Sequence, residues 1–363
     1  MFSLSLKEIR FFKLRYSLIG FIMFFVAALV FIISGLANGL SSDNASSIQN
    51  MNAHAFYLDK DADNRLDRSR FDEKVLSDIK DNKNLQAVGL QMLSLKEVDS
   101  DKKVDVSMMG IDPNSFLMPK VTEGSTIKSS KGPTIVADDS LKKQGIEIGD
   151  KLYEENSDIT YTVVGFTEKQ TFSHTPVAFV NKESWENLFP SKQKVSYNTI
   201  VIKDANKDIQ EDVSSTIKDG VWAEKGDVIK GIPGYDAEQK SLFMMLAFLI
   251  VIAVFVLTAF FYIMTIQKVN QFGVLKAIGA KNGFLIGSTI IQVIILSIVS
   301  IGAAIGFAAI LQAIMPKGIP FVFDFGVILI YSGVLFIVSI FGALLSSASI
   351  VKADPLQAMG RAE

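Results

Sequence analysis

Four long stretches of this sequence contain no charged side chain, and they constrain its fold more than any other feature. They comprise residues 17–39, 241–266, 284–315 and 327–351. Because a helix rises about 1.5 Å per residue, about 20 residues cross the ~30 Å hydrocarbon layer of a bilayer. Each stretch is therefore predicted to be a transmembrane helix.

The segment 40–240 has a different composition and is predicted to form a water-soluble domain between the first and second spans. It holds 34 of the chain's 38 acidic residues and 26 of its 36 lysines and arginines. The chain has no cysteine, so this domain must fold without disulfides. About 200 residues are enough to bury an adequate core without them.

Basic residues flanking the spans predict the orientation. The N-terminal end carries Lys7, Arg10, Lys13 and Arg15, and the segment 267–283 carries three lysines and no acid. Short loops rich in lysine and arginine stay in the cytoplasm. We therefore expect both termini and this segment to be cytoplasmic and the large domain to be extracellular. The first span is too long for a signal peptide and is expected to be a retained anchor.

The predicted fold is an α-helical membrane protein with four transmembrane helices and an inserted extracellular α+β domain. In that domain, the apolar residues of 43–83 fit helical spacing, whereas 161–169, 175–181 and 199–204 are typical of strands. The predicted segments are a cytoplasmic amphipathic helix or solvated basic leader at 1–16, a span at 17–39, the domain at 40–240, a span at 241–266, a cytoplasmic segment at 267–283, a span at 284–315, a short extracellular loop at 316–326, a span at 327–351 and a cytoplasmic tail at 352–363.

No catalytic constellation is visible in the sequence. It lacks the G-x-x-x-x-G-K-[ST] loop that cradles a nucleotide phosphate, and it shows no triad and no metal-ligand cluster. The two histidines, His54 and His174, are far apart, and we favour a surface or loop histidine over a ligand for His174. We therefore predict no catalytic residue, no metal site and no enzymatic activity in this chain.

Small residues recur inside two of the predicted spans. Gly35 and Gly39 are four residues apart in the first span, as are Gly302 and Gly306 in the third. Such spacing lets helix backbones approach closely. It is consistent with contact between two copies of the chain or with packing inside one copy, and the sequence does not choose between them.

The cytoplasmic segment 267–283 is amphipathic. Val269, Phe272, Leu275 and Ile278 recur every three residues, and the lysines project elsewhere. One face can grip an apolar surface while the other meets water or a partner. A helix lying along the membrane surface would show the same pattern.

Three motifs resemble the MacB/FtsX superfamily of ABC-transporter permeases. They are "FFYIMTIQKVNQFGVLKAIGAKNGFLI" after the second span, "KADPLQAMG" at 352–360, and "LKKQGIEIGDKL" followed by "YTVVGF" in the large domain. The order of one span, a large outer domain and three spans agrees with this superfamily. The resemblance covers nearly the whole chain.

The resemblance implies that the amphipathic segment docks on a separate cytoplasmic ATPase, which would use the ATP. The implied coupling residues are Phe272, Gly273, Leu275 and Lys276, together with Gln271, which stands where family members usually carry an acidic residue. It further implies mechanotransmission, in which closure of the ATPase dimer is relayed through the spans to the outer domain.

Within the superfamily, "SGLANGL", "YTVVGF…FSHTPV", "GYDAEQ" and "AFFYIMTIQK" look most like the HrtB-type haem-efflux permeases of Gram-positive bacteria. This likeness implies a homodimer with two HrtA-like ATPase subunits in the cell membrane, haem as the transported substrate, no cofactor of its own and no nucleic acid. Tyrosinate, carboxylate and thioether groups can each bind haem iron. The implied haem-binding candidates are Tyr235, Glu238, Met244 and Met245, with Phe243 against the porphyrin.

Other interpretations remain open. A tyrosine at the membrane interface is often only part of the aromatic belt. A methionine inside the membrane often only fills space between helices. The same fold would suit a permease that exports peptides or antibiotics, or an FtsX-like protein that signals across the membrane.

Overall fold

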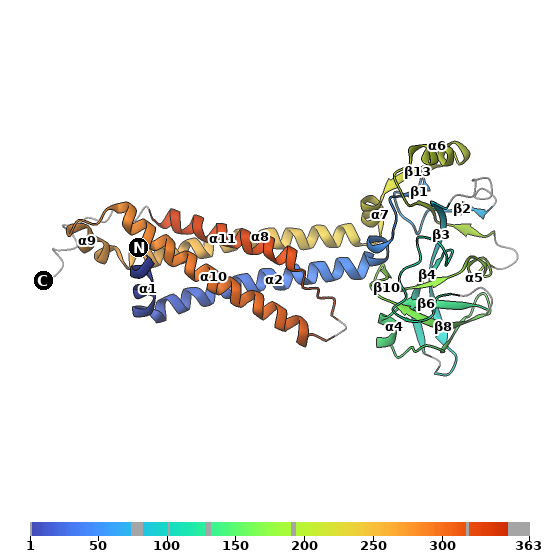
Figure 1. The fold of residues 1–363 in the computed structure, drawn as a ribbon, viewed down its shortest axis with the longest axis horizontal. Helices are drawn as coiled ribbons and strands as arrows, with labels where there is room; N and C mark the ends of the chain where they lie inside the picture. Colours follow the sequence, from blue (N-terminus) through green and yellow to red (C-terminus); the bar gives the residue numbers. More distant parts are fainter. Residues whose placement is uncertain are drawn as a thin grey trace. The chain divides into compact units, whose positions relative to one another are not determined.

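The computed structural model describes residues 2–73, 83–100, 102–127, 132–189, 194–316 and 319–347. The chain forms two compact units. The membrane unit consists of residues 1–39 and 240–363, and the inserted domain consists of residues 40–239. Figure 1 shows the elements of both. The motif at 352–360 lies outside the described residues.

The membrane unit is built from helices. Two short helices, α1 (Phe2–Phe11) and α9 (Val269–Ala277), accompany four long ones. The long helices are α2 (Lys13–Asn50), α8 (Tyr235–Ile266), α10 (Asn282–Ile314) and α11 (Phe325–Ser346). All four are long and apolar enough to cross a membrane. The four predicted apolar helices are thus confirmed.

Local sequence explains how α9 and α11 end or begin. The N-cap Asp324 accepts a hydrogen bond from the Val327 N–H at 3.0 Å and so starts α11. At the end of α9, Gly279 has φ +98°, and the N–H of Ala280 donates to the carbonyl of Leu275 at 2.9 Å. This is a Schellman arrangement, which needs a left-handed residue that glycine supplies without strain. The helix therefore ends at Ala277, and α10 begins five residues later.

Small side chains let the long helices pack closely. Ala27 and Ala28 of α2 and Ala304 and Ala308 of α10 are almost fully buried in one apolar cluster. A methyl-sized side chain allows two backbones to approach, which strengthens van der Waals contact where no hydrophobic effect operates between helices.

Two of the four glycines singled out from the sequence pack inside the chain. A β-carbon added at Gly35 would lie 2.3 Å from the Phe321 ring, and one added at Gly39 would lie 2.0 Å from the Pro320 carbonyl oxygen. Both glycines of α2 are therefore covered by the segment that precedes α11.

Gly302 and Gly306 of α10 are in a different environment. A β-carbon at either position would meet no atom of the described residues within 4 Å. These two positions leave a shallow, open strip on the surface of α10.

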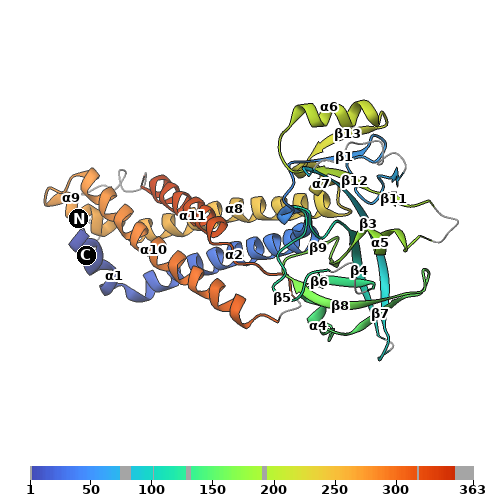
Figure 2. The same cartoon turned by 45° about the vertical axis from the view of Figure 1, so that its right-hand side comes forward.

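The inserted domain is an α+β domain. Its eleven-stranded sheet runs β13-β1-β12-β3-β4-β10-β6-β8-β5, with β7 pairing with β3 and β8, and β9 with β10 (Figure 2). The strands are β1 (Ala55–Asp59), β3 (Leu85–Glu97), β4 (Lys103–Gly110), β5 (Glu123–Gly124), β6 (Thr134–Asp138), β7 (Lys151–Glu154), β8 (Ile159–Thr167), β9 (Thr171–Phe172), β10 (Thr175–Val180), β12 (Thr199–Ile202) and β13 (Gly220–Glu224). A separate pair joins β2 (Phe71–Asp72) to β11 (Ser196–Tyr197). The short helices are α4 (Ser140–Lys143), α5 (Lys182–Glu186), α6 (Lys207–Thr216) and α7 (Lys225–Gly231).

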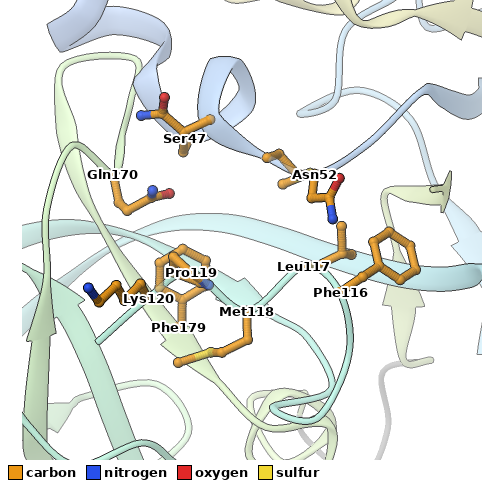
Figure 3. Close-up of a pocket in the computed structure, with 11 residues that line it drawn as sticks. Ser47, Asn52, Phe116, Leu117, Met118, Pro119, Lys120, Gln170 and Phe179 are labelled. Atoms are coloured by element: carbon orange, nitrogen blue, oxygen red, sulfur yellow. The ribbon is translucent and has the colours of Figure 1, made fainter. Parts of the chain in front are cut away.

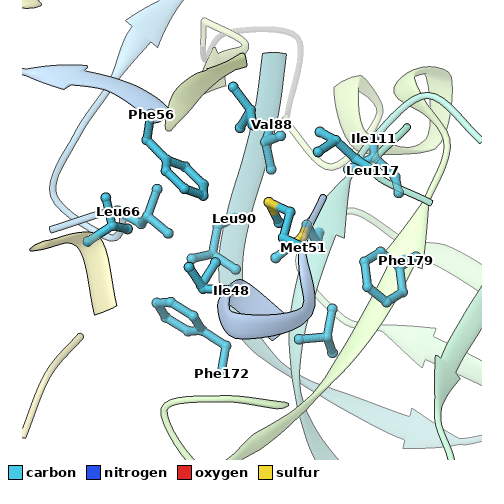
Figure 4. Packing of buried hydrophobic residues seen from close by; sticks show 14 of the residues in the cluster. Ile48, Met51, Phe56, Leu66, Val88, Leu90, Ile111, Leu117, Phe172 and Phe179 are labelled. Carbon is cyan, nitrogen blue, oxygen red and sulfur yellow. The ribbon is translucent and has the colours of Figure 1, made fainter. Parts of the chain in front are cut away.

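The last turns of α2 are part of this domain's core. Ile48 is fully buried, and Figure 4 shows it with Met51 among Phe56, Leu90 and Phe172. Burying apolar side chains contributes about 25 cal/mol per Å² of apolar surface removed from water. This packing therefore fixes the end of α2 firmly to the inserted domain.

The structure confirms some local predictions and corrects one. The stretches 161–169, 175–181 and 199–204 contain β8, β10 and β12, as predicted. The helix predicted within 43–83 is wrong beyond Asn50, because Phe56 and Phe71 lie in strands; residues 74–82 lie outside the described part. Four of the five β1 residues are buried, so both faces of that strand are apolar and the alternation that marks a strand is missing.

Candidate functional site

The first turn of α8 brings together two of the residues singled out from the sequence. Gly234, with φ +82°, precedes the helix, and Tyr235 begins it. The Tyr235 hydroxyl lies 2.8 Å from Ser41 Oγ of α2, and its ring packs at the edge of the inserted domain's core. Tyr235 is thus half-buried and already has a hydrogen-bond partner.

Both carboxylate oxygens of Glu238 are also engaged. Its Oε2 accepts a hydrogen bond from Asn44 Nδ2 at 3.2 Å, and its Oε1 lies 3.2 Å from His174 Nε2. The Glu238 side chain is 36% exposed, so solvent still reaches it. A ligand that binds this carboxylate would therefore compete with Asn44 and His174.

His174 is positioned by a tight turn between β9 and β10. Ser173 and His174 have φ of 49° and 63°, as the two central residues of a type I′ hairpin turn require. Glycine or asparagine usually occupies such positions, because a left-handed backbone is unfavourable for other residues. The turn is held by a hydrogen bond from the Ser173 N–H to the Asn44 carbonyl at 2.8 Å.

The imidazole of His174 bridges two carboxylates. Its Nδ1 lies 2.8 Å from Asp43 Oδ2, opposite the contact between Nε2 and Glu238. Partial burial alone would lower the pKa of His174, but the hydrogen bonds and charges of Asp43 and Glu238 outweigh burial and raise that pKa. The cation that results donates one N–H to each carboxylate. We call Asp43, Asn44, His174 and Glu238 the histidine cluster.

Sequence reasoning missed the histidine cluster. The sequence predicts a surface or loop histidine at position 174, and His174 does lie in a turn with its side chain 37% exposed. Its partners are 131 and 64 residues away in the chain. No local pattern connects residues at such separations, so the only available signal was the unusual turn sequence itself.

The methionines predicted as haem ligands lie farther along α8. Met244 is 56% exposed and Met245 is 46% exposed in the membrane unit. They line an open, mostly apolar groove of about 420 Å³ between α8 and α2. Its lining residues are Ile33, Ser241, Met244, Met245, Phe248, Leu249 and Ile252. Phe243 is exposed but does not line this groove.

The donor types on α8 suit haem iron better than a bare metal ion. Tyrosinate, carboxylate and thioether groups all occur as haem ligands, and the groove offers apolar surface to a porphyrin. By contrast, no group of three or more His, Asp or Glu in the described part of the chain could hold a metal ion. The residues singled out on α8 therefore offer oxygen and thioether donors, the latter beside apolar surface.

The helix α9 presents a mixed surface. Phe272 and Gly273 are buried, and Phe272 packs against Leu285 of α10, with Leu275 at the edge of the same cluster. Of the remaining residues singled out, Gln271 is exposed and Lys276 is partly buried. The exposed apolar residues here are Val274 and, just past the helix, Ile278, which is 77% exposed.

A further pocket of about 290 Å³ lies in the inserted domain, where the end of α2 meets the segment 116–120 (Figure 3). Its lining includes Ser47, Phe179 and Gln170. The Ser47 hydroxyl is buried and has no hydrogen-bond partner among the described residues. None of the residues singled out from the sequence lines this pocket.

Both parts of the chain match known protein families. Residues 21–219 match the MacB-like periplasmic core domain, and residues 243–355 match the FtsX-like permease C-terminal family. A protein of Staphylococcus haemolyticus, provisionally named hemin transport system permease protein HrtB, is 32% identical over 363 residues, which are 99% of this chain and 100% of that protein. The chain belongs to the HrtB-like permeases of the MacB/FtsX family.

A second relative supports the same assignment. A protein of Staphylococcus epidermidis with the same provisional name is 31% identical to the permease over 361 residues, covering 99% of both chains. As a member of this family the chain is an ABC permease subunit and not an ATPase, and permeases of this kind work with an ATPase partner. It is a multi-pass membrane protein, and its MacB-like domain lies outside the cytoplasm.

Solved structures give looser similarities. The extracellular domain of the noncanonic ABC-type transporter YknZ from Gram-positive bacteria is 13% identical, with a TM-score of 0.31, covering 49% of the permease and 92% of that domain. A domain of a permease from Porphyromonas gingivalis is 13% identical, with a TM-score of 0.28, covering 42% and 79%. The family assignment therefore rests on the sequence matches.

Proposed function

We propose that the permease exports haem from the membrane to the outside, driven by ATP that a separate cytoplasmic subunit hydrolyses. Relatives that match over the whole length are named for hemin transport. The observation that carries the proposal is the apolar groove on α8, because it exposes the thioethers of Met244 and Met245 beside apolar surface.

In this proposal the haem ligands come from one helix. Tyr235 and Glu238 offer oxygen ligands, Met244 and Met245 offer sulfur, and Phe248, not Phe243, lines the groove where a porphyrin face would lie. Haem dissolved in the membrane would reach the groove laterally, since four of its lining side chains are about half exposed or more. No aqueous channel through the four spans is needed.

The histidine cluster can contribute to the release of haem. Iron would compete with Asn44 and His174 for the Glu238 carboxylate. Conversely, the return of the protonated imidazole competes with iron for Glu238, because both favour the carboxylate anion. In this proposal haem binding at Glu238 and the closed histidine cluster therefore oppose one another, and closure of the cluster favours release of haem.

We infer that the working unit is a homodimer of the permease with two HrtA-like ATPase subunits. The open strip at Gly302 and Gly306 supports the dimer, because it allows a second helix backbone to approach closely. Docking of the ATPase is assigned to the outer side of α9, with Gln271, Leu275 and Lys276 next to the exposed apolar Ile278. Phe272 and Gly273 hold the inner side of α9 in place.

We infer that α2 transmits motion from the cytoplasmic side to the inserted domain, and its length supports this inference. This helix is continuous from Lys13 to Asn50, and its last turns belong to the core of the inserted domain. In this proposal a displacement at the cytoplasmic end of α2 is carried along the helix to its other end. Both termini lie in the cytoplasm in this arrangement, in the membrane of a Gram-positive bacterium such as those of the staphylococcal relatives.

Reconstituted transport tests the proposal. The permease and its ATPase are placed in liposomes loaded with haem, and haem appearing on an external acceptor is followed during ATP hydrolysis. We expect ATP-dependent efflux that disappears with a catalytically dead ATPase. An active ATPase complex that moves no haem, or that moves labelled peptides instead, would overturn it.

A further inference from the structure

Lys268 lies in the two-residue break between α8 and α9 and is the one buried lysine or arginine among the described residues. Its side chain is 0% exposed, and its backbone forms the N-cap of α9. The sequence shows it only as one of three lysines in the segment 267–283. A buried ammonium group is costly unless every donor is paired, so its surroundings indicate a specific role.

The ammonium group of Lys268 has a complete set of partners. Its Nζ lies 2.5 Å from Glu8 Oε2, 2.7 Å from the Tyr16 hydroxyl and 2.8 Å from Gln292 Oε1. An ammonium group has three donors, and all three are used. These four residues come from the α8–α9 break, α1, α2 and α10, and we call them the lysine joint.

The partners of Lys268 also bind each other. The Tyr16 hydroxyl donates to Gln292 Oε1 at 2.6 Å, and Gln292 Nε2 donates to Glu8 Oε2 at 2.5 Å. Glu8 is only 18% exposed, so its charge depends on Lys268 for compensation. The lysine joint is therefore a closed network, in which each member loses partners if any one of its helices moves alone.

A second contact fixes α1 in the same arrangement. The Ser5 hydroxyl donates to the Ser288 carbonyl of α10 at 3.0 Å, and the two hydroxyl oxygens are 3.1 Å apart. Ser5 is fully buried. α1 is thus tied to α10 at two positions, by Ser5 and by Glu8.

We propose that Lys268 is a positioning residue that makes α1, the start of α2, α9 and the start of α10 move as one rigid body. The ATPase then displaces α2 directly when it displaces α9. A sliding motion of α9 relative to α1 would leave the charges of Lys268 and Glu8 unpaired in a low-dielectric environment. This inference rests on the proposed function, in which α9 receives the ATPase.

Substitutions in the joint test this role. Lys268→Met and Glu8→Gln each remove one charge with little change in volume. The double variant Glu8→Lys with Lys268→Glu exchanges the two charges. Tyr16 and Gln292 can still form hydrogen bonds with the exchanged pair, because a hydroxyl and an amide both donate and accept. Lys13→Met is the matched control, since Lys13 is an exposed lysine at the start of α2.

The readout is haem efflux per ATP hydrolysed by the assembled complex. We expect both single variants to hydrolyse ATP but to lose about fivefold or more in efflux per ATP, and the exchanged pair to recover part of it. Lys13→Met should match the wild type. Efflux per ATP unchanged in Lys268→Met would overturn the joint, whereas a wild type that moves no haem would overturn the proposed function instead.

A cross-link gives a test that needs no haem. The chain has no cysteine, so Ser5→Cys with Ser288→Cys introduces one pair at the α1–α10 contact. If these helices move as one body, oxidation to the disulfide should leave the ATPase rate of the complex unchanged. Loss of ATPase activity on oxidation, restored by reduction, would show that α1 moves against α10 and would overturn the proposal.

Discussion

His174 Nε2 lies 3.2 Å from Glu238 Oε1, so a hairpin turn of the inserted domain restrains the carboxylate at the start of α8. The same imidazole contacts Asp43 through its other nitrogen at 2.8 Å. Since Asp43 belongs to α2, one histidine links the two helices that enter this domain.

The stability of the permease should depend on pH through His174. The two carboxylates raise its pKa in the folded state, so their stabilisation is fully present below the unfolded value of about 6.5 and is lost as the pH rises through the raised pKa. Because the cluster is partly exposed, we expect a loss of about 1 kcal/mol at most. Thermal unfolding from about pH 6 to about pH 9 measures it.

Variants test whether His174 causes this pH dependence. His174→Gln should remove most of it, and Asp43→Asn should reduce it. His54→Gln is the matched control, because His54 is exposed and lies outside the cluster. A pH dependence that survives His174→Gln unchanged would contradict the role given to this histidine.

Gly39→Ala should destabilise the membrane unit. The new methyl group would lie 2.0 Å from the Pro320 carbonyl oxygen. Overpacking of this kind should lower the free energy of unfolding by roughly 1–3 kcal/mol. The melting temperature of the purified permease should fall. Gly302→Ala is the control, since its methyl group meets open space within one chain.

A larger substitution at the same position tests the dimer contact. We expect Gly302→Leu to keep the folding of the single chain while weakening association, because a bulky side chain prevents close approach of a second helix. Light scattering in detergent gives the mass. A Gly302→Leu protein with the same mass as wild type at every concentration would place the dimer contact elsewhere.

Ile278→Asp should weaken ATPase binding without unfolding the permease. Ile278 is 77% exposed just past α9, so a charge there costs little in the free chain but disrupts an apolar docking contact. Co-purification of the ATPase should drop while the melting temperature holds. Ile278→Leu is the control, and normal ATPase recovery with Ile278→Asp would move the docking surface away from this position.

Leu275 shows why packing and docking must be separated. It lies at the edge of the cluster formed by Phe272 and Leu285, so Leu275→Asp would disturb that cluster as well as the outer side of α9. We expect this variant to lower both the melting temperature and ATPase recovery. The contrast with Ile278→Asp distinguishes the inner face of α9 from its outer face.

Much of the fold follows from local sequence, and most of the site does not. The spans are predictable because about 20 apolar residues have few alternatives to crossing a bilayer, and strands such as β8 and β12 are predictable from β-branched residues. The buried position of Phe272 was not visible, because the amphipathic pattern shows two faces of α9 without telling which one α10 covers.

Lys268 and His174 were hidden for a related reason. Each is defined by partners more than 60 residues away, except for Gln292, which lies 24 residues from Lys268. A lysine in a basic loop favours the cytoplasmic side in any membrane protein, so its burial leaves no mark on the local pattern. Only the packing of α1 against α10 reveals it.

The most direct test of haem binding is a visible-absorbance titration of the purified permease with haem, alone and with its ATPase. It compares the wild type with the double variant Tyr235→Phe and Glu238→Ala. We predict a saturable Soret shift in the wild type that the double variant loses, and that Met244→Leu alters in position or affinity. A wild type that shows no saturable shift, with or without the ATPase, would contradict haem as the substrate.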